Sequence, residues 1–469
     1  MQRINVCLFI LAMCIAGQAF AGALNVEVDF SVPDGPIKPM HGVGQPPVLS
    51  HGPEGDRLFH YLTEAGIPYS RLHDVGGAYG KNVFVDIPNL FRDFDADETN
   101  PASYDFAFTD LLISSLVKHN VEPVFRLGVT IENYAQVRRY NINPPEDFEK
   151  WARICEHVIR HYTEGWADGF HHKITYWEIW NEPDNQPEPE ENAMWNGDFM
   201  SYCRLYEITS KHLKKAFPHL KIGGYASCGF YAAANSPAVA AANSSLRTQY
   251  FIDCYTNFLA FVKQTDSPLD FFSFHSYSKP REILRQVDWG IRTLRRAGFE
   301  NTETSLNEWL PQPQHERLGT AEQAADICAA IIGMQHSDLD SAMLYDARCG
   351  RGNYSPLFNP FTYKPHKAYY VLKAFNALYQ LKTAVKVSSS ASDDVWVAAA
   401  VENAEGAVLL ANISERKISL SLDFGDYKAV ECRVIDRTRT DTEISLPSVM
   451  TPHSVLLIRC RADAASGKN

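Results

Sequence analysis

Residues 174–184 read ITYWEIWNEPD, and this stretch decides the fold class. Its first half is apolar and aromatic, as expected of a strand that is buried on both faces. It ends at Glu182 and Pro183, and proline cannot donate to a strand ladder. Apolar strands that each end in a polar side chain are typical of barrels of parallel strands, whose chemistry lies at the carboxyl ends. We therefore predict a strand over 174–182 and look for its neighbours.

The same pattern recurs along the chain between residues 40 and 380. Apolar runs that predict strands are found at 40–44, 68–73, 122–127, 174–182, 220–224, 270–277, 304–309 and 342–345. Helical patterns follow at 54–65, 106–119, 145–161, 200–216, 249–264, 279–297, 321–335 and 365–379. Strands that alternate with helices indicate βα units around a parallel sheet, and eight units predict a (β/α)8 TIM barrel over 40–380 within the α/β class.

The sequence pattern changes after residue 380, from alternating strands and helices to short strands alone. Residues 418–424 read ISLSLDF and alternate apolar with polar side chains, which predicts a strand with one buried face. Further strand patterns separated by turn residues predict a small antiparallel β-sandwich over 381–463. Residues 24–30 also alternate, so we expect an N-terminal strand within 22–39 that joins the sandwich. Residues 464–469 are expected to form a disordered tail.

The first 21 residues have the features of an export signal. Arg3 precedes an apolar run, and 19–21 read AFA, a small-x-small cleavage pattern. We predict a signal peptide that is cleaved after Ala21 and a secreted or periplasmic protein. No later stretch approaches 18 apolar residues, so no membrane association is expected.

Charge and cysteine content exclude other classes. The 44 Lys+Arg against 56 Asp+Glu give a formal net charge of −12, which argues against nucleic acid as a partner. Of ten cysteines, Cys7 and Cys14 lie in the predicted signal, and no Cys-x-x-Cys pair supports a structural zinc site. We expect mostly free buried thiols with at most one or two bridges, for which Cys432 and Cys460 are the first pair to test.

Two carboxylates close predicted strands on opposite sides of the barrel. Glu182 ends the fourth strand and Glu308 ends the seventh, so their side chains face each other across the mouth. Hydrolysis of a glycosidic bond needs one carboxyl group to protonate the leaving oxygen and a second to stabilise or attack the anomeric carbon. A separation of about 5–5.5 Å gives retention of configuration, whereas about 6.5–9.5 Å gives inversion. The pair predicts a glycosidase.

Asn181 adjoins Glu182, and neighbouring side chains of a regular strand point to opposite faces. Both reach one substrate only if the strand ends or bulges there, as Pro183 favours. An amide in this position suits a sugar hydroxyl next to the reacting carbon.

In the motifs around Glu182 and Glu308, the chain resembles glycoside hydrolase family 39, the β-xylosidases and α-L-iduronidases of the retaining (β/α)8 clan A. The residues 180–183, WNEP, resemble the acid/base motif of the clan, which implies that Glu182 is the acid/base and that Asn181 binds the 2-hydroxyl. The residues 307–309, NEW, resemble the strand-seven motif, which implies that Glu308 is the nucleophile. The Asn-Glu-Pro tripeptide also occurs in other families of the clan.

Two further motifs support the resemblance. Arg71 and His73 are similar to the Arg-x-His of the family, and His275 and Tyr277 are similar to its His-x-Tyr, in which the tyrosine hydrogen-bonds the nucleophile. Arg71 is predicted as a substrate-binding residue and, because it is always charged, is also expected to hold Glu308 ionised. His73 and His275 are expected either to touch sugar hydroxyls or to act as scaffold.

Other residues depart from the family pattern. The family usually closes strand eight with tryptophan, but residues 343–348 read MLYDAR. Arg126 stands where a carboxylate is expected in the xylosidases. Arg126, Asp346 and Arg348 either line the pocket, where an arginine suits a uronate, or form a structural ion pair. Trp309, Tyr277 and Trp180 are expected to face a sugar ring.

The sequence therefore predicts a secreted retaining glycosidase that cleaves O-glycosidic bonds in xylosides or related plant or host glycans from the chain end. No metal and no organic cofactor are expected, and the partner is a glycoside. Glu182 is expected to need a raised pKa to donate its proton. The alternative is an endo-glycanase of the cellulase or mannanase type from another clan A family. A third hypothesis is a carbohydrate-binding protein without catalysis.

Overall fold

The computed structural model describes residues 23–49, 55–76, 85–131, 142–234, 246–390 and 393–463 of the chain. The signal peptide predicted over 1–21 and the tail predicted over 464–469 lie outside the described residues.

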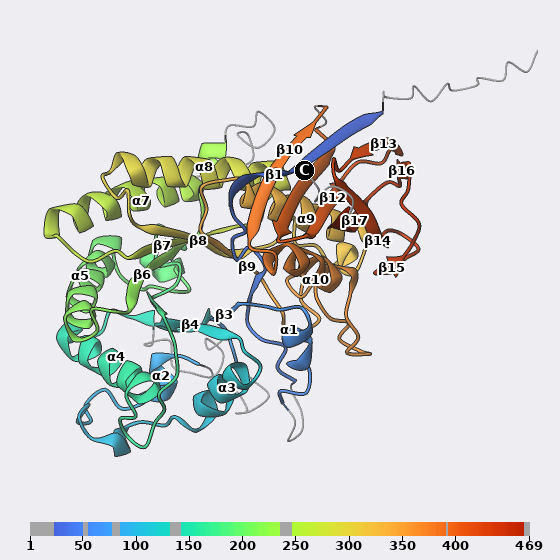
Figure 1. Cartoon of the computed structure of the whole chain (residues 1–469). Helices are drawn as coiled ribbons and strands as arrows, with labels where there is room; N and C mark the ends of the chain where they lie inside the picture. The colour runs from blue at the N-terminus through green and yellow to red at the C-terminus, as the bar shows by residue number, and fades with distance from the viewer. Residues whose placement is uncertain are drawn as a thin grey trace, which may run out of the picture.

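Eight strands form a closed barrel in chain order, and every neighbouring pair is parallel (Figure 1). Each of the eight predicted strands is present, so the predicted TIM barrel is confirmed. The strands are β2 (Gly42–Gly44), β3 (Tyr69–Leu72), β4 (Glu122–Leu127), β5 (Tyr176–Ile179), β6 (Lys221–Ser227), β7 (Phe271–Ser276), β8 (Glu303–Trp309) and β9 (Ser341–Leu344).

Helices cover the outside of the barrel. They are α1 (His60–Glu64), α2 (Ile87–Leu90), α3 (Ala107–Lys118), α4 (Phe148–Thr163), α5 (Phe199–Ala216), α7 (Leu246–Thr265), α8 (Pro280–Arg296), α9 (Ala321–Gln335) and α10 (Lys367–Tyr379). Short 3-10 helices lie at η1 (Pro101–Ser103), η4 (Pro189–Glu191), η5 (Tyr231–Ala234) and η6 (His315–Arg317). Only His60–Glu64 is helical within the described part of the helix predicted at 54–65.

Side chains at the helix starts explain several boundaries. Asp147 accepts a hydrogen bond from the backbone N–H of Lys150 at the start of α4, and Asp198 accepts one from Ser201 at the start of α5. Pro280 occupies the first turn of α8, where its missing N–H costs nothing. These caps satisfy amides that the helix itself leaves without a partner.

A nine-stranded sheet packs beside the barrel in the order β15-β14-β17-β12-β11-β10-β1-β13-β16. Its pairings are antiparallel except for that of β1 with β13, which is parallel. The strands are β1 (Leu24–Pro36), β10 (Thr383–Ser389), β11 (Val395–Glu402), β12 (Glu405–Asn412), β13 (Ile418–Asp423), β14 (Tyr427–Ile435), β15 (Thr442–Glu443), β16 (Val449–Met450) and β17 (Ser454–Ala462).

The sheet curls until strands that are not neighbours face each other, which produces the predicted sandwich. Phe30 of β1 lies 4.3 Å, between ring centroids, from Tyr427 of β14, although four strands separate β1 from β14 in the sheet order. Alternate residues of β12 serve two cores: Val408 and Leu410 pack inside the curl, whereas Leu409 packs toward the barrel. Both faces of β12 are therefore buried.

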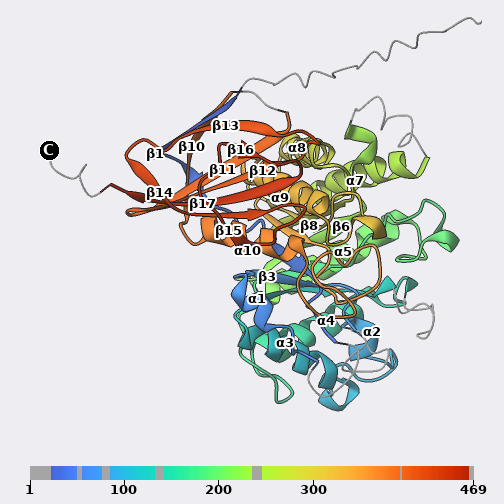
Figure 2. The same ribbon diagram turned by 90° about the vertical axis from the view of Figure 1, so that its right-hand side faces the viewer.

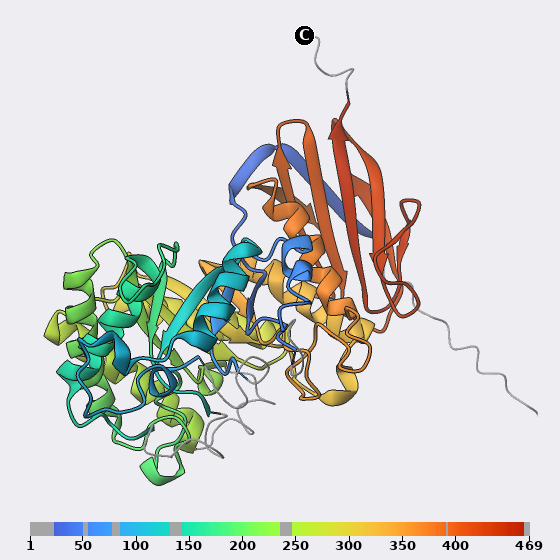
Figure 3. The same ribbon diagram turned by 90° about the horizontal axis from the view of Figure 1, so that it is seen from below.

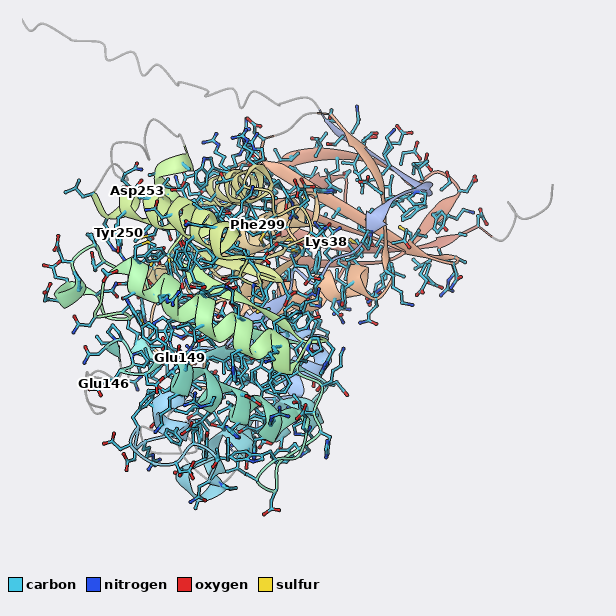
Figure 4. The ribbon with its side chains drawn as sticks, turned by 90° about the vertical axis from the view of Figure 1, so that its left-hand side faces the viewer. Lys38, Glu146, Glu149, Tyr250, Asp253 and Phe299 are labelled. Atoms are coloured by element: carbon cyan, nitrogen blue, oxygen red, sulfur yellow. The ribbon has the colours of Figure 1, made fainter. Side chains whose placement is uncertain are left out.

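Helices α9 and α10 lie between the barrel and the sheet, as Figures 2 and 3 show from two directions. Lys38 lies at this boundary (Figure 4), where its backbone N–H donates to Gln335 Oε1 at 2.8 Å and its ammonium donates to Ser337 O at 2.5 Å. Since Gln335 ends α9, these bonds tie the chain between β1 and β2 to the interlayer helices.

The structure bears on two further predictions, namely the possible disulfide bridges and the absence of a membrane-spanning segment. The eight cysteines from Cys155 to Cys460 are free. Cys432 faces Ile458 in the β14–β17 register and Cys460 faces Ala429, so the two suggested partners are not opposite each other. Among the described residues, no helix combines the length and the apolar character needed to cross a bilayer.

Candidate active site

The fourth barrel strand ends earlier than predicted, and the change of backbone direction positions two side chains. β5 stops at Ile179, and both Trp180 (φ 75°) and Glu182 (φ 44°) adopt the left-handed conformation that residues other than glycine rarely adopt. The backbone N–H of Glu182 then donates to Ala226 O at 3.0 Å. Asn181 and Glu182 consequently both line one cavity, which a continuous strand would prevent.

Packing of Trp180 fixes this departure from the strand. Its ring contacts Trp195 at 5.0 Å and Trp151 at 5.8 Å between centroids, and its indole N–H donates to Met194 O at 2.9 Å. The side chain is 1% exposed. Burial of this large ring stabilises a backbone conformation that costs on the order of 1–2 kcal/mol per residue.

An irregular register between β7 and β8 brings the second carboxylate, Glu308, to the cavity that Glu182 lines. The shift falls between Phe274 and His275, and it makes His275 the partner of Glu308 across the two strands. Irregularities of this kind re-aim side chains at the rims of barrels. Glu308 is 6% exposed and lines the same cavity as Glu182.

Each oxygen of Glu308 accepts a hydrogen bond. Arg71 Nη1 donates to Oε2 at 3.0 Å, and the Tyr277 hydroxyl donates to Oε1 at 2.5 Å. Burial and the charge of Glu308 raise the pKa of Tyr277 well above its usual value, so the phenol keeps its proton and remains a donor. Glu308 is therefore held in one orientation by a permanent cation and a neutral donor.

Glu178 lies behind Arg71 and fixes it in turn. Arg71 Nε donates to Glu178 Oε2 at 2.7 Å, and both side chains are completely buried. Glu178 Oε1 accepts from Ser273 Oγ at 2.6 Å and from Asn307 Nδ2 at 2.5 Å. These donors stabilise the buried negative charge of Glu178, and that charge in turn compensates the positive charge of Arg71 on the side away from Glu308.

Glu182 has different partners. Its Oε1 lies 2.7 Å from His275 Nδ1, and its Oε2 accepts from Asn185 Nδ2 at 2.8 Å. Burial raises the pKa of Glu182, but the hydrogen bond and positive charge of His275 and the Asn185 amide outweigh it, so the net direction is downward. The expected rise in the pKa of Glu182 is therefore wrong for this structure.

The opposite pKa shifts of this pair favour a proton on the imidazole of His275 over one on Glu182. Burial lowers the pKa of His275, but the negative charges of Glu308 and Glu182 raise it above its usual value. His275 Nε2 lies 3.7 Å from Glu308 Oε2, so the ring stands between the two carboxylates.

One ligand atom from each of Glu182, His275 and Glu308 lies within 4.8 Å of the others. This is the spacing of side chains that could share a cation. The oxygens, however, already accept hydrogen bonds from Arg71, Tyr277 and Asn185, which is the donor set of solvated carboxylates. The close approach of the carboxylates also matters for glycoside chemistry, since retention requires a short separation.

A cavity of about 510 Å³ opens at the barrel mouth above these groups. The predicted site residues that line it are His73, Asn181, Glu182, Tyr277 and Glu308. Arg71 and His275, predicted to bind substrate, are completely buried and contact the two carboxylates instead. The structure thus brings seven of the eight predicted residues into one cluster.

Trp309 is the eighth, and its predicted contact with a sugar ring is wrong. Its side chain is 0% exposed, belongs to the apolar core and does not line the cavity. It follows Glu308 directly in β8, and because neighbours in a strand point to opposite faces, an inward Glu308 sends Trp309 outward. Trp180 likewise lines a separate cavity of about 330 Å³, together with Pro144 and Pro145.

Arg126, Asp346 and Arg348, whose roles the sequence did not decide, differ in their positions. Arg348 Nε pairs with Asp346 Oδ2 at 2.8 Å, so the structural ion pair is present, and Arg348 also lines the cavity. Arg126 is completely buried and does not line it. Burial lowers the pKa of Arg126 to about 10, although the charges of Asp86 and Asp74 oppose this.

His73 is buried as well, and the charges of two buried arginines act on it. Burial and the charges of Arg126 and Arg71 lower the pKa of His73 well below its usual value, so its ring is neutral. Its Nε2 lies 3.2 Å from Asp74 Oδ2.

Several residues of the site were not predicted. Glu178 stands four positions before Glu182 in the quoted stretch, and its charge within a buried strand is a signal that sequence reasoning could have used. Tyr345 occupies the place of the expected strand-eight tryptophan, where its hydroxyl accepts from Gln45 Nε2 at 2.8 Å. Asn185 and Arg247 lie outside the strands and carry no periodic signal.

Comparison with known proteins agrees with this geometry. Residues 62–288 match the family described as glycosyl hydrolases family 39. The chain belongs to glycoside hydrolase family 39. The family match includes Arg71, Asn181, Glu182, His275 and Tyr277, whereas Glu308 lies beyond it.

Individual relatives of this family-39 protein differ in how much they share with it. A β-xylosidase from Geobacillus stearothermophilus is 27% identical over 207 residues, which are 42% of this chain and 36% of the relative. The chain thus matches little more than a third of the length of that relative. A glucosidase structure from Croceicoccus marinus has a TM-score of 0.73 at 18% identity and covers 94% of this chain and 99% of its own.

A second solved structure shows the same fold. The monomeric β-xylosidase from Caulobacter crescentus CB15 has a TM-score of 0.65 at 17% identity, with 94% of this chain and 100% of the other covered. Barrel and sheet therefore occur together in other proteins of this architecture.

Proposed function

We propose that this protein is a retaining glycosidase that uses Glu308 as nucleophile and Glu182 as acid/base. The observation that carries the proposal is the pair of carboxylates, each with an oxygen within 4.8 Å of the other, with different partners. Glu308 accepts a hydrogen bond from the fixed cation Arg71, as suits a carboxylate that attacks, whereas Glu182 lies 2.7 Å from the titratable ring of His275, as suits a group that exchanges a proton.

The first step forms a covalent intermediate. A Glu308 oxygen attacks the anomeric carbon while the bond from this carbon to the leaving oxygen breaks, and Glu182 gives its proton to that oxygen. Asn181 is oriented for the sugar: Arg71 Nη2 donates to Asn181 Oδ1 at 2.5 Å, and because guanidinium is only a donor, the Asn181 Nδ2 group stays available for a hydroxyl.

The second step releases the sugar. Ionised Glu182 takes a proton from water, the water oxygen bonds to the anomeric carbon, and Glu308 leaves. His275 and Asn185 stabilise the ionised Glu182 that this step needs. The first step needs the protonated form, so the rate of the first step falls as the pH rises above the pKa of Glu182.

The substrate we propose is a xyloside or a related glycoside that is cut from the chain end. The β-xylosidase names of relatives support this proposal. We also propose export, with the 1–21 segment as signal peptide. Release of monosaccharide from an oligosaccharide supports the exo mode, whereas internal cuts support an endo-glycanase. A mature N-terminus at Gly22 in exported protein would support the cleavage site.

The test of the chemistry uses a panel of aryl glycosides followed by the nucleophile variant. The panel contains aryl β-xyloside, α-L-arabinoside, β-glucoside, β-galactoside and uronide. Proton NMR of the best substrate should show a first product of retained configuration. Glu308→Ala should lose turnover, and azide should restore it with a glycosyl azide of inverted configuration as product. An inverted sugar from the native enzyme, or full activity of Glu308→Ala, contradicts the proposal.

A further inference from the structure

The two carboxylates divide the cavity into two sides, if the proposed function holds. An acid must touch the glycosidic oxygen that it protonates, so the leaving group lies on the Glu182 side. The sugar that becomes attached to Glu308 lies on the other side, where the rings of Tyr277, Tyr345 and Tyr354 are packed together with centroids 5.0–6.4 Å apart. The chemistry of the Glu182 side therefore reports on the leaving group.

Arg247 lies on the Glu182 side, near the start of α7, the helix on which Figure 4 labels Tyr250 and Asp253. Its Nε donates to the backbone oxygen of Asn185 at 2.8 Å. Asn185 in turn donates from its amide to Glu182 Oε2 at 2.8 Å. One residue thus connects the guanidinium with the proposed acid, which places Arg247 beside the leaving group.

Phe251 holds the guanidinium from the other side. The central carbon of the Arg247 guanidinium lies 4.9 Å from the centroid of the Phe251 ring, one helical turn further along α7. Both residues line the cavity. Stacking on an aromatic face fixes the plane of the guanidinium and leaves its edge for a ligand.

The described residues give Arg247 no ion-pair partner. Within the part of the chain that the structure describes, no carboxylate lies within ion-pair distance of Arg247, although Arg348, which also lines the cavity, is paired with Asp346 at 2.8 Å. A planar guanidinium that is oriented in this way matches the geometry of a carboxylate, which it binds through two parallel hydrogen bonds.

We propose that Arg247 and Phe251 form a leaving-group subsite that selects glycosides whose leaving group carries a carboxylate. Two sources offer this chemistry, namely a uronic acid residue and an aromatic acid. The ring of Phe251 suits both, because it can pack against the apolar face of a sugar or against an arene. This inference rests on the proposed function and adds to it the class of the leaving group.

The experiment compares matched substrates that share the glycone found by the aryl glycoside panel. One arm pairs the 4-nitrophenyl glycoside with its 3-carboxy-4-nitrophenyl analogue, and the other pairs a neutral disaccharide with one that ends in a uronic acid. The measured quantity is the ratio of kcat/KM for the carboxylated and the neutral substrate, which cancels general effects of a substitution. We expect Arg247→Gln to lower this ratio about 10-fold in at least one arm.

Further variants separate charge from shape. Arg247→Lys keeps the charge but not the planar fork, so the ratio should fall by a smaller factor. Arg160→Gln is the matched control, because Arg160 also stacks on an aromatic ring, that of Phe217 at 5.2 Å, but lies on α4 and does not line the cavity. Its ratio should equal that of the native enzyme. High salt should reduce the native ratio, because the site is open to solvent.

The two substrate pairs distinguish a uronic acid from an aromatic acid as the source of the carboxylate. Failure of this inference and failure of the proposed function give different results. A 10-fold effect in one arm alone assigns the carboxylate to that source. A ratio that Arg247→Gln leaves within twofold of the native value in both arms overturns the inference. Absence of turnover of every substrate by the native protein instead contradicts the proposed function.

Discussion

Arg71 Nε donates to Glu178 Oε2 at 2.7 Å while the other end of the same guanidinium holds Glu308. All three side chains are at least nine-tenths buried. The orientation of the proposed nucleophile is thus set by a carboxylate that does not reach the cavity. Glu178 is in this sense a positioning residue, and its role can be separated from catalysis itself.

Glu178→Gln should lower kcat/KM about 10- to 100-fold, the penalty expected when a reacting group loses its alignment. The substitution removes the charge that anchors Arg71 but keeps the shape and one acceptor oxygen. Kinetics with an aryl glycoside and the melting temperature should be measured together. Glu303→Gln is the control, because Glu303 accepts from Tyr176 and Lys221 at the other end of the barrel. Native kcat/KM in Glu178→Gln would show that Arg71 needs no anchor.

Glu182→Ala should show a dependence on the leaving group. A 2,4-dinitrophenolate departs without a proton, so the first step with this substrate should stay within about tenfold of native, whereas poorer leaving groups should lose about 10²–10⁴-fold. The plot of log kcat/KM against the pKa of the leaving group should therefore become steep. Azide should accelerate turnover of the intermediate. Equal losses for all leaving groups would assign Glu182 a structural role.

His275→Gln should move the alkaline limb of the kcat/KM profile to higher pH. The positive charge of His275 lowers the pKa of Glu182, so the protonated acid is lost at a lower pH in the native protein. Without that charge the pKa of Glu182 rises, and a shift of about one unit is expected for loss of a neighbouring opposite charge. An alkaline limb at the native pH would contradict the assignment. His172→Gln, in the segment before β5 and at the opposite end of the barrel from the mouth, should leave the limb in place.

The barrel could be predicted because each strand is an apolar run that ends in a polar residue, a signal that depends only on local sequence. The parallel pairing of β1 with β13 could not, since the paired residues Leu24 and Leu420 are 396 positions apart and alternation does not indicate whether two strands pair parallel or antiparallel. The helix at 54–65 was overestimated because its apolar spacing fits a helix, whereas only five described residues form one.

The candidate site was predictable where chemistry coincides with a strand end. Glu182 and Glu308 were found in this way. The protonation of the Glu182–His275 pair was not, because it depends on a bulge at Asn307 in β8, which makes His275 the partner of Glu308. Trp309 was assigned to the cavity because it adjoins Glu308 in the sequence. Neighbouring side chains of a strand point to opposite faces, so Trp309 points into the core when Glu308 points into the cavity.

Asp184 gives a prediction about stability, because burial and the charge of Glu182 raise its pKa to about 7. Folding thus keeps a proton that the unfolded chain loses near pH 4, so the stability present below that pH is lost progressively up to about pH 7. Asp184→Asn keeps a partner for the Ser227 hydroxyl and the Cys228 N–H that now bond the carboxylate. It should raise the free energy of unfolding at pH 8 by no more than about 4 kcal/mol and leave it little changed at pH 4.

Urea unfolding at pH 4, 6 and 8 checks the sign. Asp436 is the opposite case, since hydrogen bonds with Arg439 and Thr438 outweigh burial and lower its pKa to about 2. Its stabilising effect is present above pH 4 and is lost as the pH falls toward 2, so Asp436→Asn should destabilise the protein at pH 8. A gain for Asp184→Asn at pH 4 equal to that at pH 8 would show that packing rather than ionisation is responsible.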